Sequence, residues 1–249
     1  MKQQTANVSS ALNWPRSVVP DSIPADEVHI WAWTFETINV DPSPHIGLLD
    51  SQELERMNAF YFARDRARFA MNHANVRRIL GVYLHQAPEQ IRFAADRFGK
   101  PELVDRELLA FNLSHSRSVA VLALAQEGPV GVDVENVRPI EPEVATRHFS
   151  PAECAALKPL QGDEWLNGFY RCWTRKEAIL KAEGIGLHRA LDSFDVELRP
   201  EEPAALLASR ESLRYAWKLH HLDPAAGTVG ALATANPNAR LSCFSFLPS

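Results

Sequence analysis

Four ionisable residues in the second half of the sequence have the types and spacing of a site for a phosphorylated substrate. Asp133 and Glu135 lie two residues apart, and Glu177 and Lys181 lie four residues apart. Residues two apart on a strand share a face, and residues four apart on a helix are surface neighbours. Carboxylate oxygens are ligands that Mg²⁺ prefers, and an ammonium group binds phosphate. The set predicts a metal-phosphate site.

Each pair also has a simpler explanation. The strand pair alone is typical of solvated acids at a strand end, and the helix pair alone is typical of a surface ion pair that contributes a few tenths of a kcal/mol. The helix is apolar around much of its circumference, however, through Phe169, Trp173, Ile179 and Leu180. Phe169 and Trp173 are predicted to be core residues rather than substrate contacts. Charges on a buried helix need partners or a metal.

A polar segment, residues 112–116, lies where a short predicted strand at 110–113 ends. Its Ser114 and His115 are adjacent in sequence, which is a poor geometry for a nucleophile and its base, and no G-x-S-x-G turn is present. Contact with phosphate or a nucleotide is the favoured role for Asn112, Ser114 and His115. An excess of basic side chains that could bind phosphate lies upstream, although half of them fit the solvent-exposed face of a helix. They are Arg56, Arg64, Arg66, Arg68, Arg77, Arg78 and Lys100.

The composition is that of an ordinary folded protein, with 46% hydrophobic and 23% charged residues among 249. The net charge of −5 argues against a nucleic-acid-binding surface. The three cysteines have no zinc-site spacing and indicate free thiols in a reducing cytosol. No apolar run approaches the length of about 20 residues that spans a bilayer, and the first residues lack the apolar core of a signal peptide. We therefore expect a cytoplasmic protein that binds neither nucleic acid nor membrane.

Hydrophobic periodicity and turn residues predict alternating groups of strands and helices. Helices are predicted over 51–61 and 65–84, after Ser150, and over 164–183 with a stop at Gly184. The segment 131–137 is predicted to be a hairpin partner or neighbour of the buried strand before it. The other predicted strands are 29–35, 90–93, 118–126, 193–198, 215–222, 228–235 and 241–247, and the first thirty residues are expected to form an extended lead-in.

The order of elements repeats once along the chain. Ser51 opens a helix that a longer one follows, Ser150 opens the same pair again, and strands bracket both pairs. We therefore expect an α/β (α+β) pseudodimer of two similar halves, residues 1–128 and 129–249, each a small, mainly antiparallel sheet with packed helices. The active site is expected at their interface.

Four segments, in this order and spacing, resemble the Sfp-type (surfactin-type) 4′-phosphopantetheinyl transferases. They are FGKPEL at 98–103, FNLSHS at 111–116, GVDVE at 131–135 and FYRCWTRKEAILKAEGIGL at 169–187. The segment FYFARDRAR at 60–68 also resembles that family. The similarity covers residues 51–197, and the last fifty residues carry no motif.

The resemblance implies a monomer that moves the phosphopantetheine arm of coenzyme A onto a serine of an apo acyl, peptidyl or aryl carrier protein, releasing adenosine 3′,5′-bisphosphate. It implies Mg²⁺, or alternatively Mn²⁺, on Asp133, Glu135 and Glu177. Glu177 and Lys181 would be the catalytic residues, with Glu177 or a metal-bound water taking the serine proton. The coenzyme A contacts would include Asp133 and Lys181 together with Arg56, Arg68, Gly99, Lys100, Asn112, Ser114 and His115. The carrier and its pathway, from fatty acid, polyketide or nonribosomal peptide synthesis to lysine metabolism, stay open.

Two other classes of protein would use similar residues. A Mg²⁺-dependent phosphohydrolase would release free phosphopantetheine without a carrier. A non-catalytic coenzyme A-binding module would bind coenzyme A without transferring anything, although Glu177 and Lys181 argue against that class. The products formed with and without a carrier distinguish the three.

Overall fold

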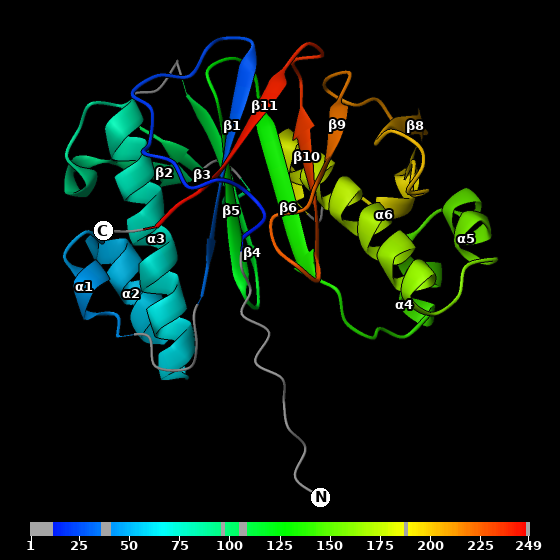
Figure 1. Ribbon diagram of the computed structural model, residues 1–249, viewed down its shortest axis with the longest axis horizontal. Coiled ribbons are helices and arrows are strands. Elements are labelled where there is room, and N and C mark those ends of the chain that lie inside the picture. The colour runs from blue at the N-terminus through cyan, green and yellow to red at the C-terminus, as the bar shows by residue number, and fades with distance from the viewer. Residues whose placement is uncertain (1–11, 36–40, 96–97, 105–108, 187–188, 248–249) are drawn as a thin grey trace, which may run out of the picture.

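The computed structural model describes residues 12–35, 41–95, 98–104, 109–186 and 189–247. Strands occupy the middle of the molecule, and the helices cover its two flanks (Figure 1). The helices are α1 (Ser43–Ile46), α2 (Ser51–Ala59), α3 (Ala63–Tyr83), α4 (Glu143–His148), α5 (Pro151–Leu157) and α6 (Gly162–Glu183), with 3₁₀ turns η1 (Pro88–Gln90) and η3 (Leu191–Ser193). The strands are β1 (Glu27–Thr34), β2 (Phe93–Ala95), β3 (Pro101–Leu103), β4 (Ala110–Ser116), β5 (Val119–Ala125), β6 (Val130–Asn136), β7 (Phe194–Val196), β8 (Leu206–Ser209), β9 (Lys218–Leu222), β10 (Thr228–Thr234) and β11 (Arg240–Ser245).

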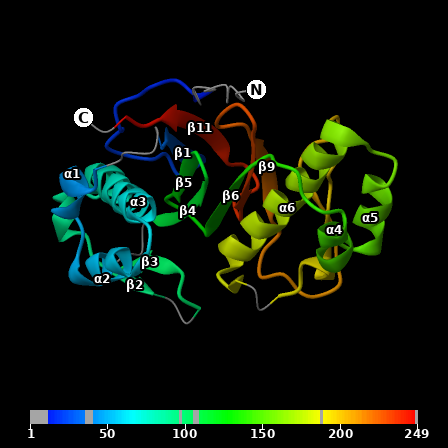
Figure 2. The same ribbon diagram turned by 90° about the horizontal axis from the view of Figure 1, so that it is seen from below.

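The predicted pseudodimer of two α/β halves is confirmed by the topology. A four-stranded sheet has the order β11-β1-β5-β4, and a three-stranded sheet has the order β6-β10-β9. In each half a first strand is followed by three helices and later by an antiparallel pair, which gives the equivalent orders β1-β5-β4 and β6-β10-β9. Helices α1 to α3 flank the first sheet, and α4 to α6 flank the second (Figures 1 and 2).

The strand β11 breaks this symmetry. It leaves the second half and pairs in parallel with β1, from Glu27 opposite Arg240 to Ala32 opposite Ser245. Its aromatic side chain Phe244 stacks on Trp31, with ring centroids 4.6 Å apart. The last strand therefore completes the sheet and the core of the first half.

The sequence signals for helix ends are confirmed. Ser150 caps α5 by accepting a hydrogen bond from the backbone N–H of Glu153, whose side chain accepts one from the N–H of Ser150. Helix α6 ends at Gly184, which has the left-handed φ of 70° that favours glycine. The short helices α2 and α5 thus begin in the same way, because Asp50 and Glu53 form an equivalent capping box.

Several local predictions differ from the structure. The segment β6 packs beside β5, as one alternative predicted, but is not its hairpin partner, since β5 pairs with β1 and β4 while β6 pairs with β10. Strand β4 continues to Ser116, so the polar residues 112–116 lie within a strand rather than after it. The predicted strand 90–93 is a 3₁₀ turn followed by β2, and the short elements α1, α4 and β8 carry no clear periodicity.

Candidate active site

The predicted catalytic residues meet in one pocket of about 340 Å³ between β4, β6 and α6. Asp133 and Glu177, which come from different elements, line the same pocket. A metal site requires this convergence, because carboxylates on separate surfaces could not share an ion. The full set of lining residues is Leu113, Ser114, His115, Asp133, Glu135, Trp173, Glu177 and Lys181.

Asp133 is the most buried carboxylate of this pocket, with 4% of its surface exposed. Its Oδ1 forms an ion pair of 2.7 Å with the Nζ of Lys181 and accepts a hydrogen bond of 3.0 Å from the Oγ of Ser114. Lys181 also donates to the Oγ of Ser114 at 2.9 Å. The second oxygen, Oδ2, is buried and has no hydrogen-bond partner within the described residues. A buried carboxylate oxygen without a hydrogen-bond partner is suited to coordinate a cation.

Glu135 points the same way from β6, as the strand alternation predicts, while Val132 and Val134 are fully buried. Its Oε2 accepts a hydrogen bond of 2.8 Å from the Oγ of Ser116. Each carboxylate of β6 therefore accepts a hydrogen bond from a serine of β4: Asp133 from Ser114, and Glu135 from Ser116.

The same β4 side chains join the two halves. Strands β4 and β6 are edge strands of different sheets, and side chains of β4 accept hydrogen bonds from the backbone N–H groups of β6. We call this row of contacts the seam. The three pairs are Val132 to Asn112 at 2.8 Å, Val134 to Ser114 at 3.3 Å and Asn136 to Ser116 at 3.1 Å. The seam satisfies backbone donors that an open edge would leave unpaired.

Negative charge accumulates in the pocket. Burial and the charge of Asp133 raise the pKa of Glu177, and the nearby ammonium of Lys181 only partly opposes this shift. Burial also raises the pKa of Glu135, again with a contribution from Asp133, against the hydrogen bond from Ser116. Carboxylates that repel one another in this way would bind a divalent cation favourably.

Gly131 explains why the helix that carries Glu177 lies so near the strand that carries Asp133. A Cβ atom at Gly131 would lie 2.1 Å from the carbonyl oxygen of Ala178 and 2.3 Å from the backbone nitrogen of Ala182. Only a residue without a side chain allows this approach of α6 to β6. The glycine that precedes the acidic pair is thus a packing requirement of the site.

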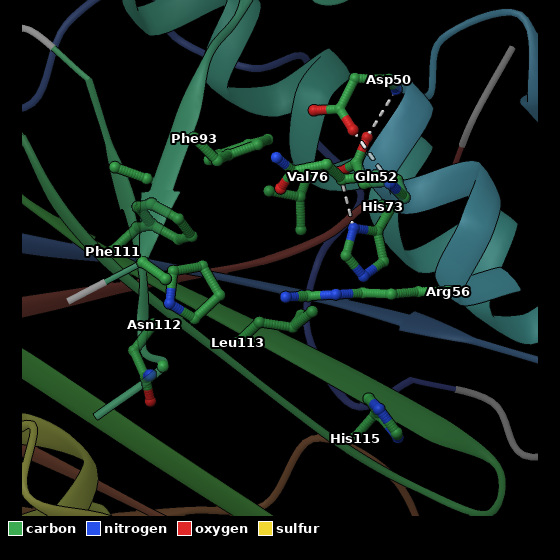
Figure 3. A pocket seen from close by; sticks show the side chains of 15 residues that line it. Asp50, Gln52, Arg56, His73, Val76, Phe93, Phe111, Asn112, Leu113 and His115 are labelled. Atoms are coloured by element: carbon green, nitrogen blue, oxygen red, sulfur yellow. Dashed lines mark hydrogen bonds and ion pairs between the residues drawn. The ribbon is translucent and has the colours of Figure 1, made fainter. Parts of the chain in front are cut away.

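Two further pockets adjoin this one, because His115 and Leu113 line all three. The larger, of about 480 Å³, includes Arg56, Gly99 and Asn112 in its wall. Figure 3 shows the Arg56 side chain extending across it, with His115 at one side. The smaller, of about 340 Å³, includes Arg68. The structure therefore places most of the predicted coenzyme A contacts around adjoining cavities.

Lys100 is not among the residues that line these three pockets. Its Nζ donates to the carbonyl oxygen of Lys181 at 2.7 Å and to that of Val130 at 3.4 Å. The hydrogen bond to Lys181 links the segment 98–103 to the last turn of α6. The role of Lys100 in binding coenzyme A stays a prediction.

Sequence reasoning missed three side chains of these pockets. Trp173, expected in the core, is half-buried and lines the catalytic pocket, while Phe169 is a core residue as predicted. Ser116 belongs to the predicted polar segment but was given no role of its own, although the period of two places it on the strand face of Asn112 and Ser114. His73 lines both outer pockets, and its spacing from other polar residues carries no signal of this.

Known proteins resemble both halves of the chain. The family described as "4′-phosphopantetheinyl transferase superfamily" matches residues 129–235, and "4′-phosphopantetheinyl transferase, N-terminal" matches residues 39–127. The 4′-phosphopantetheinyl transferase HetI of Nostoc sp. is 38% identical over 85% of this chain and 89% of its own length. The corresponding values for the transferase Sfp of Bacillus subtilis are 31%, 78% and 85%. The chain belongs to the Sfp-type 4′-phosphopantetheinyl transferases. As a member of this family, it is an enzyme that transfers phosphopantetheine to carrier proteins.

A solved structure, the holo-[acyl-carrier-protein] synthase of Thermotoga maritima, matches 42% of this chain and 61% of its own with a TM-score of 0.35 and 20% identity. The described parts of the chain contain no helix that is long and apolar enough to cross a membrane.

Proposed function

We propose that this transferase moves the phosphopantetheine arm from coenzyme A to the serine hydroxyl of an apo carrier protein at the pocket between β4, β6 and α6. The observation that carries the proposal is the convergence of Asp133, Glu135, Glu177 and Lys181 on that pocket, across the seam between the halves. The adjoining outer pockets, with Arg56 in the wall of the larger one, would hold the nucleotide.

Asp133, Glu135 and Glu177 would hold the Mg²⁺ ion, or Mn²⁺ in its place. Two observations support this fit: the unpartnered Oδ2 of Asp133, and the raised pKa values of both glutamates, to which the charge of Asp133 contributes. Within the described ranges, no three His, Cys, Asp or Glu side chains lie close enough together to hold an ion as they stand. When bound, such an ion neutralises charge on the pyrophosphate.

The chain's own residues would supply the proton transfers. Glu177 takes the proton of the serine hydroxyl as the serine oxygen forms its bond to the β-phosphorus of coenzyme A. The bond from that phosphorus to the bridging oxygen breaks, and its electrons leave with adenosine 3′,5′-bisphosphate. A raised pKa makes Glu177 a stronger base than an ordinary glutamate. Lys181 offsets the charge on the leaving oxygen, or donates a proton to it.

We assign residues 1–128 to a nucleotide-binding half and residues 129–249 to a half that carries the carboxylates. The turn at Gly128, with a φ of 74°, and the two family matches on either side of it support this boundary. Both sides of the pocket come from one chain, which supports a monomeric enzyme. The cysteines Cys154, Cys172 and Cys243 are free thiols, which supports a cytoplasmic location.

One experiment tests the proposal. The enzyme is incubated with coenzyme A, Mg²⁺ and a panel of apo carrier proteins, and each carrier is weighed by mass spectrometry. We expect an increment of one phosphopantetheine on at least one carrier, its loss with EDTA, and its loss when the acceptor serine of that carrier is replaced by alanine. Release of free phosphopantetheine without a carrier, or binding of coenzyme A with no transfer to any carrier, would contradict the proposal.

A further inference from the structure

His73 on α3 faces the outer pockets and has no role in the proposal above. It lines both the pocket that contains Arg56 and the pocket that contains Arg68. Its side chain keeps 24% of its surface exposed, and its ring stacks on Phe69 with centroids 3.9 Å apart. In Figure 3 the ring stands over the Arg56 side chain, which extends into the same cavity. The imidazole is thus held in one orientation beside a cation.

The partner of His73 determines which ring nitrogen faces the cavity. The Nδ1 lies 2.7 Å from the Oε1 of Glu53, a buried carboxylate whose Oε2 accepts hydrogen bonds from Arg77 and from the backbone N–H of Asp50. Burial alone would raise the pKa of Glu53, but the hydrogen bonds from His73 and Arg77 hold it below its usual value. An ionised carboxylate only accepts hydrogen bonds, so Nδ1 carries the proton. The Nε2 is the atom left for a ligand.

The ion pair behind His73 occurs in both halves of the molecule. Glu53 follows the cap of α2 and pairs with Arg77 at 2.7 Å. Glu153 follows the cap of α5 and pairs with Lys176 at 2.8 Å. Each cation also donates to backbone carbonyls just beyond its helix, Arg77 to that of Ile91 and Lys176 to that of Leu191. The two arrangements are therefore equivalent under the internal repeat.

The position of His73 in this repeat shows that an imidazole is not needed for the ion pair. His73 lies four residues before Arg77, and the residue four before Lys176 is Cys172. Cys172 is fully buried in the core of the second half. The same position is thus occupied by a small buried side chain in one half and by a partly exposed histidine that faces a cavity in the other. The histidine is better explained by a ligand than by packing.

The outer cavities favour an anionic ligand, because each acid in their walls, Asp50, Glu53 and Asp65, already lies against a basic side chain. Arg56 lines the larger outer pocket, Arg68 lines the smaller one, and Lys181 lines the catalytic pocket. The cationic groups therefore extend from the catalytic pocket to the outer cavities. Coenzyme A carries phosphate at two places, the pyrophosphate and the ribose 3′-phosphate. The carboxylates and Lys181 account for the first, and the outer cations are left for the second.

We propose that His73, held by Glu53, binds the ribose 3′-phosphate of coenzyme A through Nε2 and contributes to the preference of the enzyme for coenzyme A over its 3′-dephospho form. This inference rests on the proposed function. It makes His73 a specificity-determining residue that acts together with Arg56 and Arg68. The substrate-binding cluster of the first half would then be the counterpart of a purely structural cluster in the second.

The test compares binding of adenosine 3′,5′-bisphosphate and of adenosine 5′-monophosphate by calorimetry, without metal or carrier. In His73→Asn the amide nitrogen takes the place of Nδ1 and keeps the bond to Glu53, but no group replaces Nε2. A hydrogen bond to a charged group implies a loss of about tenfold or more in affinity for the bisphosphate. Affinity for the monophosphate should stay within about twofold by the same reasoning. The ratio of KM values for coenzyme A and 3′-dephospho-coenzyme A should shift in parallel, with kcat unchanged.

Equal losses for both nucleotides, or no loss for either, would overturn the inference. So would wild-type enzyme that binds the monophosphate as tightly as the bisphosphate, a result that does not depend on the folding of any variant. The urea midpoint of His73→Asn provides the stability control. If wild-type enzyme modifies no carrier, the proposed function fails; if it modifies carriers and His73→Asn still prefers the bisphosphate as wild type does, only the inference about His73 fails.

Discussion

Glu177 shows how a reactive group can cost stability. Its pKa is raised by burial and by the charge of Asp133, so ionised Glu177 is less favourable in the folded chain than in the unfolded one. Its ammonium neighbour Lys181 forms its ion pair with Asp133 instead. The folded protein therefore holds a base that it does not fully neutralise.

Replacing Glu177 by glutamine should consequently have opposite effects on activity and stability. The loss of a general base is expected to lower kcat by at least about 10²-fold. Removal of an unfavourable charge is expected to raise the urea midpoint measured without divalent ions. Activity within threefold of wild type would contradict the assigned role, and a lowered midpoint would contradict the electrostatic account.

The same raised pKa predicts the acid limb of the rate profile. The base is active only when ionised, so kcat/KM should fall as the pH drops through the pKa of Glu177 in the free enzyme. In the protein without a bound ion this pKa lies above the ordinary value of 4.5, so at subsaturating Mg²⁺ the fall should begin at a higher pH than for an unperturbed glutamate. The measurement is the pH dependence of kcat/KM with a carrier that is itself stable over that range. A fall centred at or below the ordinary value would count against Glu177 as the base.

Replacing Asp133 should change the Mg²⁺ requirement of the enzyme, whereas replacing Glu177 should lower kcat. Its Oδ2 is proposed to coordinate the ion, so Asp133→Ala is expected to raise the Mg²⁺ concentration needed for half-maximal activity by about tenfold or more. Titration of activity with Mg²⁺ measures this shift. An unchanged titration midpoint in Asp133→Ala would remove Asp133 from the proposed set of ligands.

At the scale of elements, local signals predicted much of the structure. The capping boxes, the glycine stop after α6 and the alternation in β6 depend on a few neighbouring residues, and they are confirmed. Of the two alternatives for β6, the hairpin with β5 was wrong, because Gly128 and its neighbours resemble a hairpin turn, whereas the actual partner, β10, lies about a hundred residues downstream. Long-range pairing depends on packing that no local window contains.

The catalytic residues were predictable for a related reason. Asp133, Glu135, Glu177 and Lys181 lie in two short motifs, and each motif has its own periodicity. His73 and Trp173 were not identified, because a helical residue faces either a core or a cavity according to what lies opposite. The sequence does not show which surface that is.

Gly131 supports a prediction about the contact between α6 and β6. In Gly131→Ala the new methyl group would overlap the backbone of Ala178 and Ala182, so the helix must move away from the strand. We expect a loss of about 1–3 kcal/mol or more in the free energy of unfolding. Activity should fall as well, since Glu177 would move relative to Asp133. Urea unfolding and the transfer assay measure the two effects.

A matched control is Gly47→Ala. Gly47 has a φ of −64°, and a Cβ atom there would meet nothing within 4 Å. This change should leave activity unaltered and alter stability by less than about 1 kcal/mol, in the stabilising direction. Equal stability of Gly131→Ala and Gly47→Ala would show that α6 tolerates a side chain beneath it.

At the scale of the molecule, β11 links the second half to the core of the first. Phe244 is half-buried and stacks on Trp31. Phe244→Ala should therefore lower the free energy of unfolding by about 2 kcal/mol. The rate per folded molecule should be unchanged, because Phe244 is neither a seam residue nor one that lines the three pockets described. Unaltered urea unfolding would indicate that β11 contributes little to the first half.

The parallel pairing of β1 with β11 has a consequence during synthesis. Ser242 meets Glu27 although 215 residues separate them, and almost the whole polypeptide lies between the two partners. During translation, one edge of β1 stays unpaired until β11 has been synthesised. Contacts of such high sequence separation form slowly, and open edges recruit other chains. A nascent chain with this unpaired edge would depend on chaperones for longer than the small size of each half suggests.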